Sequence, residues 1–227
     1  MSIAESEVKA RRIAQLARDL ARLRGDVPAA ADNPVSFWVP GRIEILGKHT
    51  DYGGGRSLLC AVERGICIVA SARPGHAAST STASTVRILD ARSGDVAELE
   101  LSPDVESTPR HWSNYAITVA RRIAMNFPGE MRGADIAFTS DLPPAAGVSS
   151  SSALVVAFFL ALSAINDLPA RQEYRDSIQT PEDLAGYLGC VENGLDFKSL
   201  HGRAGVGTFG GSEDQTAVLC ARPNALV

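Results

Sequence analysis

The sequence has few cysteines, and it lacks the patterns in which cysteine and histidine bind zinc. Only four of its 227 residues are cysteine, and none of them forms a C-x-x-C pair. No apolar secretory segment precedes them, so we expect four reduced thiols in a cytoplasmic protein and no disulfide framework. The missing metal-ligand spacing excludes the common kinds of structural zinc site.

The sequence also lacks a long apolar segment and an excess of positive charge. Its longest apolar run, residues 153–165, is shorter than the roughly 20 residues that a membrane-spanning helix needs, so we expect a buried helix there. The formal net charge is −4 at pH 7, whereas a protein that binds nucleic acid usually carries a basic patch. We therefore expect a globular protein that binds neither membrane nor nucleic acid.

Several well-known catalytic patterns are missing. The phosphate-binding loop GxxxxGK[ST] does not occur, and neither does the HRD and DFG pair of protein kinases. No GxSxG nucleophile motif is present either. A protein with this sequence that uses ATP must bind it with another design.

Hydrophobic periodicity predicts an α+β protein. Residues 5–24 have the spacing of a solvated amphipathic helix, and residues 111–127 and 180–193 also read as helices. The last of these has Thr180 as N-cap and Pro181 at its first position. The predicted strands are 35–46, 57–72, 86–90, 96–101 and 134–140, with 86–101 as a hairpin. We assign 1–34 to an N-terminal helix and linker and 35–227 to one domain.

Four consecutive serines, residues 149–152, stand between a predicted loop and the apolar run. The start of a helix leaves backbone N–H groups unpaired and carries a partial positive charge, so it can bind an anion. Serine is also a favoured N-cap, and one serine would need no further role. These residues alone leave phosphate binding and plain capping equally open.

Three segments, taken together and in order, resemble the motifs of the GHMP small-molecule kinases. PGRIEILGKHTDYGGGRSL is similar to the galactokinase signature GRxNLIGEHTDYxGGxxL. PPAAGVSSSSALV resembles the second family motif, PxxxGLSSSA, and GGSEDQ resembles the glycine-rich segment that ends in the catalytic Asp-Gln. The resemblance implies the family's N-terminal domain, a mixed and mostly antiparallel sheet backed by helices.

The resemblance also implies ATP-dependent phosphorylation of a small sugar, with ATP and Mg²⁺ as cofactors, and it favours the anomeric C1 hydroxyl as the acceptor. It makes Asp214 the base beside the sugar hydroxyl and Arg42 the group that stabilises the transferred phosphoryl. The residues that it assigns to the ATP phosphates are Gly147, Ser149, Ser150 and Ser151. Ser151 and Glu192 match the metal ligands.

The sugar-contacting residues implied by the resemblance are Lys48, His49, Asp51 and Tyr52. Lys48 stands where galactokinases have glutamate, which replaces a hydrogen-bond acceptor by a donor. Glu44 stands where they have asparagine. We therefore expect a substrate that differs from galactose near C6, such as a pentose or an acidic or otherwise modified hexose.

The resemblance spans residues 40–215 and leaves the family's ferredoxin-like C-terminal domain without a counterpart. A longer segment also separates Glu192 from Asp214 than in galactokinases. Three interpretations stay open: a sugar kinase or its N-terminal portion, a non-catalytic sugar and nucleotide sensor, and a truncated inactive product.

Overall fold

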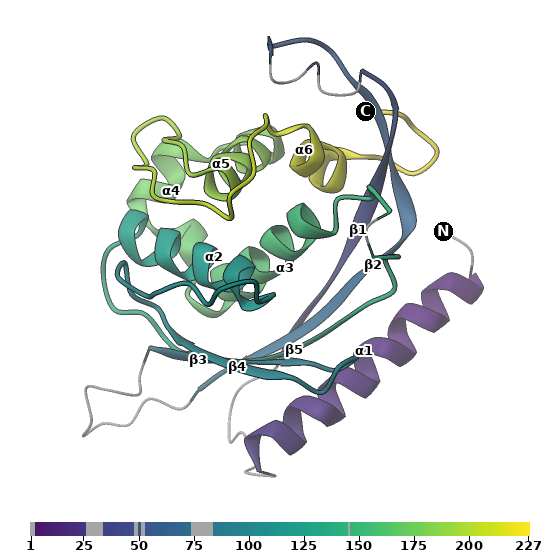
Figure 1. Ribbon diagram of the computed structural model, residues 1–227. Coiled ribbons are helices and arrows are strands. Elements are labelled where there is room, and N and C mark those ends of the chain that lie inside the picture. The colour runs from purple at the N-terminus through teal and green to yellow at the C-terminus, as the bar shows by residue number, and fades with distance from the viewer. Residues whose placement is uncertain (1–2, 26–33, 48–49, 51–52, 74–83, 145) are drawn as a thin grey trace.

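The computed structural model describes residues 3–25, 34–47, 50, 53–73, 84–144 and 146–227. These residues form a five-stranded sheet with the order β1-β2-β5-β3-β4 (Figure 1). The strands are β1 (Val35–Leu46), β2 (Leu58–Ala72), β3 (Thr85–Asp90), β4 (Val96–Glu100) and β5 (Ala134–Ser140). Only the β3–β5 pair among them is parallel. The predicted mixed, mostly antiparallel sheet is confirmed.

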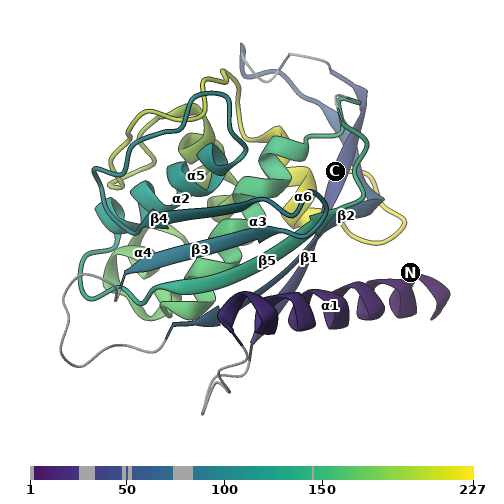
Figure 2. The same cartoon turned by 60° about the horizontal axis from the view of Figure 1, so that its bottom comes forward.

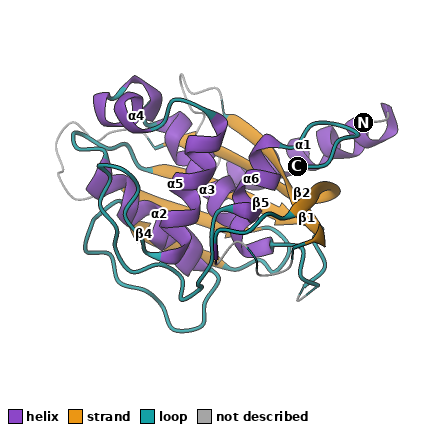
Figure 3. Ribbon diagram, turned by 90° about the horizontal axis from the view of Figure 1, so that it is seen from above, coloured by secondary structure: helices purple, strands orange, loops and turns teal. Residues whose placement is uncertain are grey.

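Helices cover both faces of this sheet, but unequally. The helices are α1 (Ile3–Arg24), α2 (Ser113–Asn126), α3 (Ser150–Ile165), α4 (Gln172–Ser177), α5 (Pro181–Asn193) and α6 (Glu213–Cys220), with a short 3₁₀ turn η2 (Leu168–Ala170). Helix α1 lies alone on one face, and α2 to α6 lie on the other (Figures 1 and 2). Seen from above, α2, α3 and α5 cross over the strands (Figure 3).

Helix α1 is predicted as a solvated helix. The structure confirms the helix but shows that one side of it is buried against the sheet. Leu16 and Leu20 are 1% and 3% exposed and pack against β2 and β5. An ion pair between Arg12 and Asp141 adds a polar attachment. The leucines recur at the helical period and form one apolar stripe, so only the opposite side of α1 faces water.

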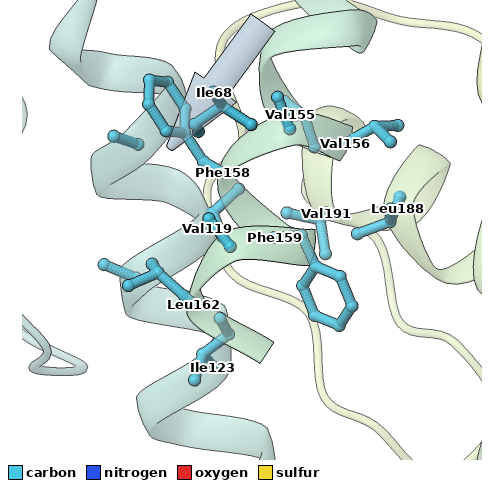
Figure 4. Packing of buried hydrophobic residues seen from close by; sticks show 14 of the residues in the cluster. Ile68, Val119, Ile123, Val155, Val156, Phe158, Phe159, Leu162, Leu188 and Val191 are labelled. Carbon is cyan, nitrogen blue, oxygen red and sulfur yellow. The ribbon is translucent and has the colours of Figure 1, made fainter. Parts of the chain in front are cut away.

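The predicted buried helix after the serine run is confirmed as α3. Its side chains Val155, Val156, Phe158, Phe159 and Leu162 are at most 1% exposed. They contact Val119 and Ile123 of α2, Leu188 and Val191 of α5, and Ile68 of β2 (Figure 4). A helix that is apolar on all sides must be covered on all sides. This packing fixes the position at which α3 begins.

Strands β1 and β2 extend beyond the rest of the sheet as a two-stranded arm. Strand β2 pairs with β5 only from Ile66 to Ala72, whereas it pairs with β1 back to Leu58. The register of β1 shifts at Gly41, where an added Cβ would lie 2.8 Å from the carbonyl oxygen of Val148. Glycine therefore allows β1 to approach the loop before α3.

The capping prediction for α5 is confirmed. The Asp183 N–H donates to Thr180 Oγ1 at 3.0 Å, and the Thr180 N–H donates back to Asp183 Oδ2 at 3.2 Å. Pro181 occupies the first turn, and Gly194 ends the helix with a φ of 80°. These local signals set both ends of α5 and so fix Glu192 in its last turn.

Two further features concern the whole chain. The four cysteines are free thiols, and Cys67 is buried beneath α1. None of the described helices combines the length and the apolar character that crossing a membrane requires.

Candidate active site

A cleft of about 570 Å³ lies where the β1 arm, the start of α3, the end of α5 and the start of α6 converge. Four chain segments that are distant in sequence form its walls. The predicted site residues that line it are Arg42, Gly147, Ser151, Glu192 and Asp214. The fold therefore brings residues from all three motif segments to one place.

Arg42 and Asp214 are in direct contact. Arg42 Nε donates to Asp214 Oδ1 at 2.6 Å across 172 residues of sequence. The two side chains are only 12% and 25% exposed, so solvent screens their attraction less than that of a surface pair. The contact places a guanidinium and a carboxylate side by side in the cleft.

The loop before α3 holds Arg42 in place. The Arg42 backbone N–H donates to the Val148 carbonyl oxygen at 3.2 Å, and Arg42 Nη1 donates to that of Gly147 at 2.8 Å. Gly147 has a φ of 67°, a conformation that glycine adopts without strain. Arg42 thus bridges Asp214 and the phosphate-binding loop implied by the resemblance.

Ser149 does not cap α3 with its side chain. Its backbone is left-handed, with φ 55° and ψ 47°, and its hydroxyl makes no capping hydrogen bond. Instead Ser149 Oγ donates to Asp214 Oδ2 at 2.5 Å, and Ser152 Oγ donates to the same oxygen at 3.2 Å. Plain capping therefore does not explain the serine run, because the hydroxyls of Ser149 and Ser152 donate to a carboxylate of the cleft.

Glu192, in the last turn of α5, lines the same cleft as the start of α3. It is 4% exposed, and Gln215 Nε2 donates to its Oε2 at 2.5 Å. Burial raises the pKa of Glu192, and the nearby charge of Asp214 raises it too, while hydrogen bonds from Ser152, Ser151 and Gln215 lower it. The net rise means that burial disfavours the charged form of Glu192, a cost that a nearby cation would offset.

The longer segment between Glu192 and Asp214 does not separate the two residues in space. It folds back on itself, with a bridge between Phe197 and Leu200, and returns to α5 where the Val206 N–H donates to the Glu192 carbonyl oxygen at 2.9 Å. Gly205 lies so close that an added Cβ would be 2.0 Å from that oxygen. The extra residues form a loop beside the cleft.

Two consecutive arginines of α2 hold this loop, and sequence reasoning did not single them out. Arg121 Nη1 donates to the Ala204 carbonyl oxygen at 3.2 Å, and Arg122 Nη1 donates to that of Leu195 at 2.9 Å. Arg122 is 1% exposed and lies over the Tyr187 ring at 5.6 Å. The sequence signal that could have identified them is a pair of adjacent arginines inside an apolar helical pattern.

The predicted sugar-contacting residues Lys48, His49, Asp51 and Tyr52 lie outside the described residues. The parts of their segment that the structure describes are tied to α6. Ser57 Oγ donates to Glu213 Oε2 at 2.5 Å, next to Asp214 in the chain. Glu213 was not predicted as a site residue.

The donor set of the cleft fits a polyphosphate with Mg²⁺. Helix α3 carries no acidic residue in its first turn, so its N-terminus can attract phosphate oxygens. Among the described residues, no group of three or more His, Cys, Asp or Glu side chains could hold a metal ion. Ser151 and Glu192 instead offer hard oxygens, and Mg²⁺ commonly completes its shell with water and phosphate oxygens.

Comparisons with known proteins match two segments of the chain to family models. The model "Galactokinase galactose-binding signature" matches residues 29–72, and "GHMP kinases N terminal domain" matches residues 114–195. The galactokinase of Actinobacillus pleuropneumoniae is 33% identical over 134 residues, 59% of this chain and 33% of that protein. That of Haemophilus influenzae is 30% identical over 135 residues, 60% of this chain and 33% of that protein.

Both matched segments and both relatives make this chain similar to the galactokinase-like GHMP kinases. The solved Lactococcus lactis galactokinase, complexed with galactose, has the same fold with a TM-score of 0.67 and 22% identity over 90% of this chain and 45% of that one. Methanococcus jannaschii mevalonate kinase matches with a TM-score of 0.60 and 12% identity, over 86% of this chain and 53% of that one.

The matched part of the chain corresponds to an N-terminal portion of these proteins. The chain spans about a third of the length of the curated galactokinases that it matches. The galactose-binding signature includes the four predicted sugar-contacting positions that lie outside the described residues.

We expect Glu192→Gln to change how stability depends on pH. Burial raises the pKa of Glu192 above its ordinary value of 4.5, so its contribution to stability is present below 4.5 and is lost as pH rises through the raised pKa. A glutamine side chain at this position does not titrate. The free energy of unfolding of the variant should therefore rise relative to the parent between acidic and neutral pH, as measured by chemical denaturation. The exposed substitution Glu106→Gln is the control for a lost charge, and an identical pH profile for both variants would contradict the prediction.

We also expect Ser57 and Glu213 to be energetically coupled. Ser57→Ala and Glu213→Ala each break the same hydrogen bond. The free energy of unfolding should therefore fall less in the double variant than the sum of the two single decreases. The coupling should be about 1 kcal/mol in a double-mutant cycle of unfolding. Glu213→Gln keeps an acceptor oxygen, so a cycle with this variant should show much less coupling than the cycle with Glu213→Ala. Strict additivity would show that the bond is not formed in solution.

Proposed function

We propose that this chain provides the phosphate-binding and sugar-binding part of an ATP-dependent sugar kinase. The reaction transfers the γ-phosphoryl group of ATP to a sugar hydroxyl, the anomeric C1 hydroxyl. The observation that carries the proposal is the Arg42–Asp214 contact at the start of α3, within the cleft that Ser151 and Glu192 also line. Phosphoryl transfer needs these parts together: a group for the hydroxyl proton, positive charge near the phosphoryl group, and an anchored phosphate chain.

Asp214 acts on the acceptor hydroxyl. Its carboxylate takes the proton as the sugar oxygen forms its bond to phosphorus and the bond from phosphorus to the leaving ADP oxygen breaks. Asp214 is 25% exposed, so a substrate can reach it, and Arg42 holds one of its oxygens. A fixed carboxylate presents the accepting oxygen in one direction, which favours proton transfer from a bound hydroxyl.

Arg42 supplies positive charge beside the reacting group. Its Nε is engaged with Asp214 and its Nη1 with the Gly147 carbonyl oxygen. A guanidinium carries five N–H donors, so this geometry leaves donors for phosphoryl oxygens. Because the side chain is held from both sides, it needs little reorganisation when negative charge develops.

The start of α3 and the end of α5 would hold the nucleotide. Gly147, Ser149 and Ser150 bind phosphate oxygens through backbone N–H groups and hydroxyls. Ser151 and Glu192 would hold Mg²⁺, which would offset the charge of the triphosphate. The buried carboxylate of Glu192 supports this role, because a cation would compensate its desolvation.

The substrate is a small sugar recognised by Lys48, His49, Asp51 and Tyr52. Imidazole, carboxylate and phenol groups suit hydroxyl recognition, because each can form directional hydrogen bonds. Lys48 adds a cationic donor at the position where galactokinases have an acceptor. We infer from this difference a substrate that departs from galactose near C6.

A coupled ADP-release assay tests the kinase. It should be run on this chain and on any longer polypeptide that contains it, with Mg²⁺ and a sugar. We expect Asp214→Asn to lower kcat by about 10²-fold to 10⁴-fold, the usual contribution of a general base. Asp95→Asn, in the exposed hairpin turn, is the matched control and should keep the parental rate.

The same preparation separates the kinase from a sensor. Sugar-dependent thermal stabilisation without ADP release in any form of the protein would identify a non-catalytic binder. Equal rates for Asp214→Asn and the parent would remove Asp214 from the mechanism. Ser151→Ala should raise the Mg²⁺ concentration needed for half-maximal rate, with Ser93→Ala, in the exposed turn between β3 and β4, as its control.

A panel of sugars tests the substrate. We expect a pentose, a uronic acid or another modified hexose to give a higher kcat/KM than galactose, because Lys48 and Glu44 change the chemistry of two signature positions. The measurement is kcat/KM for each sugar at saturating ATP. A kcat/KM for galactose far above all the others would contradict the expectation.

A further inference from the structure

Both carboxylate oxygens of Asp214 are already engaged. Arg42 donates to Oδ1 at 2.6 Å, and Ser149 and Ser152 donate to Oδ2 at 2.5 and 3.2 Å. A base that takes the proton of a substrate hydroxyl needs an oxygen to which that hydroxyl can donate. The short bond from Ser149 therefore competes with the substrate for Oδ2.

Ser149 reaches Asp214 from an unfavourable backbone conformation. Its φ of 55° and ψ of 47° lie in the left-handed region, which is costly for a residue with a Cβ. Its hydroxyl makes no capping bond to the helix, which would be the ordinary role of serine at this position. Non-glycine residues in this conformation persist where surrounding contacts hold them, often at functional sites. The bond to Asp214 is such a contact.

We propose that Ser149 is a positioning residue that exchanges its hydrogen bond between Asp214 and a nucleotide phosphate. Before nucleotide binds, Ser149 holds the Asp214 carboxylate. When a phosphate oxygen takes the Ser149 hydroxyl, Oδ2 of Asp214 becomes available to the sugar hydroxyl. This inference rests on the proposed function and adds an order to it, in which nucleotide binding prepares the base.

The exchange follows from the number of protons that a serine hydroxyl can donate. A serine hydroxyl has one proton to donate, so it cannot serve Asp214 and a phosphate fully at the same time. The N-terminus of α3 draws phosphate oxygens toward Ser149, and a charged phosphate is a strong acceptor. The two acceptors therefore compete for one donor.

The carboxylate keeps its orientation during the exchange. Arg42 still donates to Oδ1, and the carbonyl oxygens of Gly147 and Val148 hold Arg42 independently of Ser149 Oγ. Ser152 also remains, with its longer bond of 3.2 Å to Oδ2. Only one donor leaves Asp214, and the oxygen that it leaves is the one that faces the serine run.

A double-mutant cycle on unfolding tests the exchange. The variants are Ser149→Ala, Asp214→Ala and both together, measured with and without a non-hydrolysable ATP analogue and Mg²⁺ at saturation. Without nucleotide we expect a coupling that changes the unfolding equilibrium constant by about tenfold, because the hydrogen bond involves a charged group. With nucleotide bound the coupling should disappear. A merely structural bond would give the same coupling in both conditions.

Two further variants keep the result interpretable. Ser150→Ala in a cycle with Asp214→Ala is the matched control, because the described hydrogen bonds include none between these residues, and it should give no coupling in either condition. Ser149→Gly removes the same hydroxyl but adopts the left-handed backbone without strain. It should therefore repeat the coupling of Ser149→Ala while unfolding at a higher temperature.

The outcomes separate this inference from the kinase proposal. Coupling that persists with bound nucleotide, or is absent without it, overturns the exchange and leaves the kinase standing. Failure of the nucleotide to bind the parent protein, measured by calorimetry in the same buffer, overturns both. Loss of coupling on nucleotide binding supports the exchange.

Discussion

Helix α3 packs against the sheet and the helices α2 and α5, and most of its apolar side chains are buried. Burial of a large side chain such as Phe158 or Phe159 contributes about 2 to 3 kcal/mol, so the position of the helix is strongly determined. Its N-terminus is consequently a fixed point. The loop before α3 approaches β1. Asp214, at the start of α6, accepts hydrogen bonds from the hydroxyls of Ser149 and Ser152. The cleft is therefore a consequence of how one apolar helix is covered.

The Arg42–Asp214 pair joins the β1 arm to α6 at this fixed point. Partly buried ion pairs lose hydration on both sides, and they are retained at little or no gain in stability unless other hydrogen bonds compensate. Here the compensation comes from the loop carbonyl oxygen of Gly147 on the arginine side and from Ser149 and Ser152 on the aspartate side. Each compensating group belongs to the segment that the proposal assigns to phosphate binding. The pair and the phosphate loop therefore form one hydrogen-bonded network, in which a change of partner at one position reaches the other.

Sequence patterns predict the local parts of this arrangement and miss the contacts between distant parts. The apolar run of α3, the strand pattern of β5 and the helix start at Thr180 each depend on neighbouring residues, and each element is found as predicted. The direction of the Ser149 hydroxyl depends on where α6 lies, so local capping rules could not give it. The return of the segment after Glu192 depends on Arg121 and Arg122, which act across more than 70 residues of sequence.

The charges that line this cleft would disfavour a bare polyphosphate. Its described lining includes the carboxylates Glu44, Glu192, Glu213 and Asp214, and one guanidinium, Arg42, which is already paired. A triphosphate would add several negative charges, and the α3 N-terminus offers only about half a positive charge in return. A divalent cation beside Glu192 would offset both the phosphates and the buried carboxylate. The same burial raises the pKa of Glu192, so protons and metal compete for one side chain. Glu192 contributes to the negative charge that disfavours a bare polyphosphate, and the same carboxylate would favour a metal-bound polyphosphate.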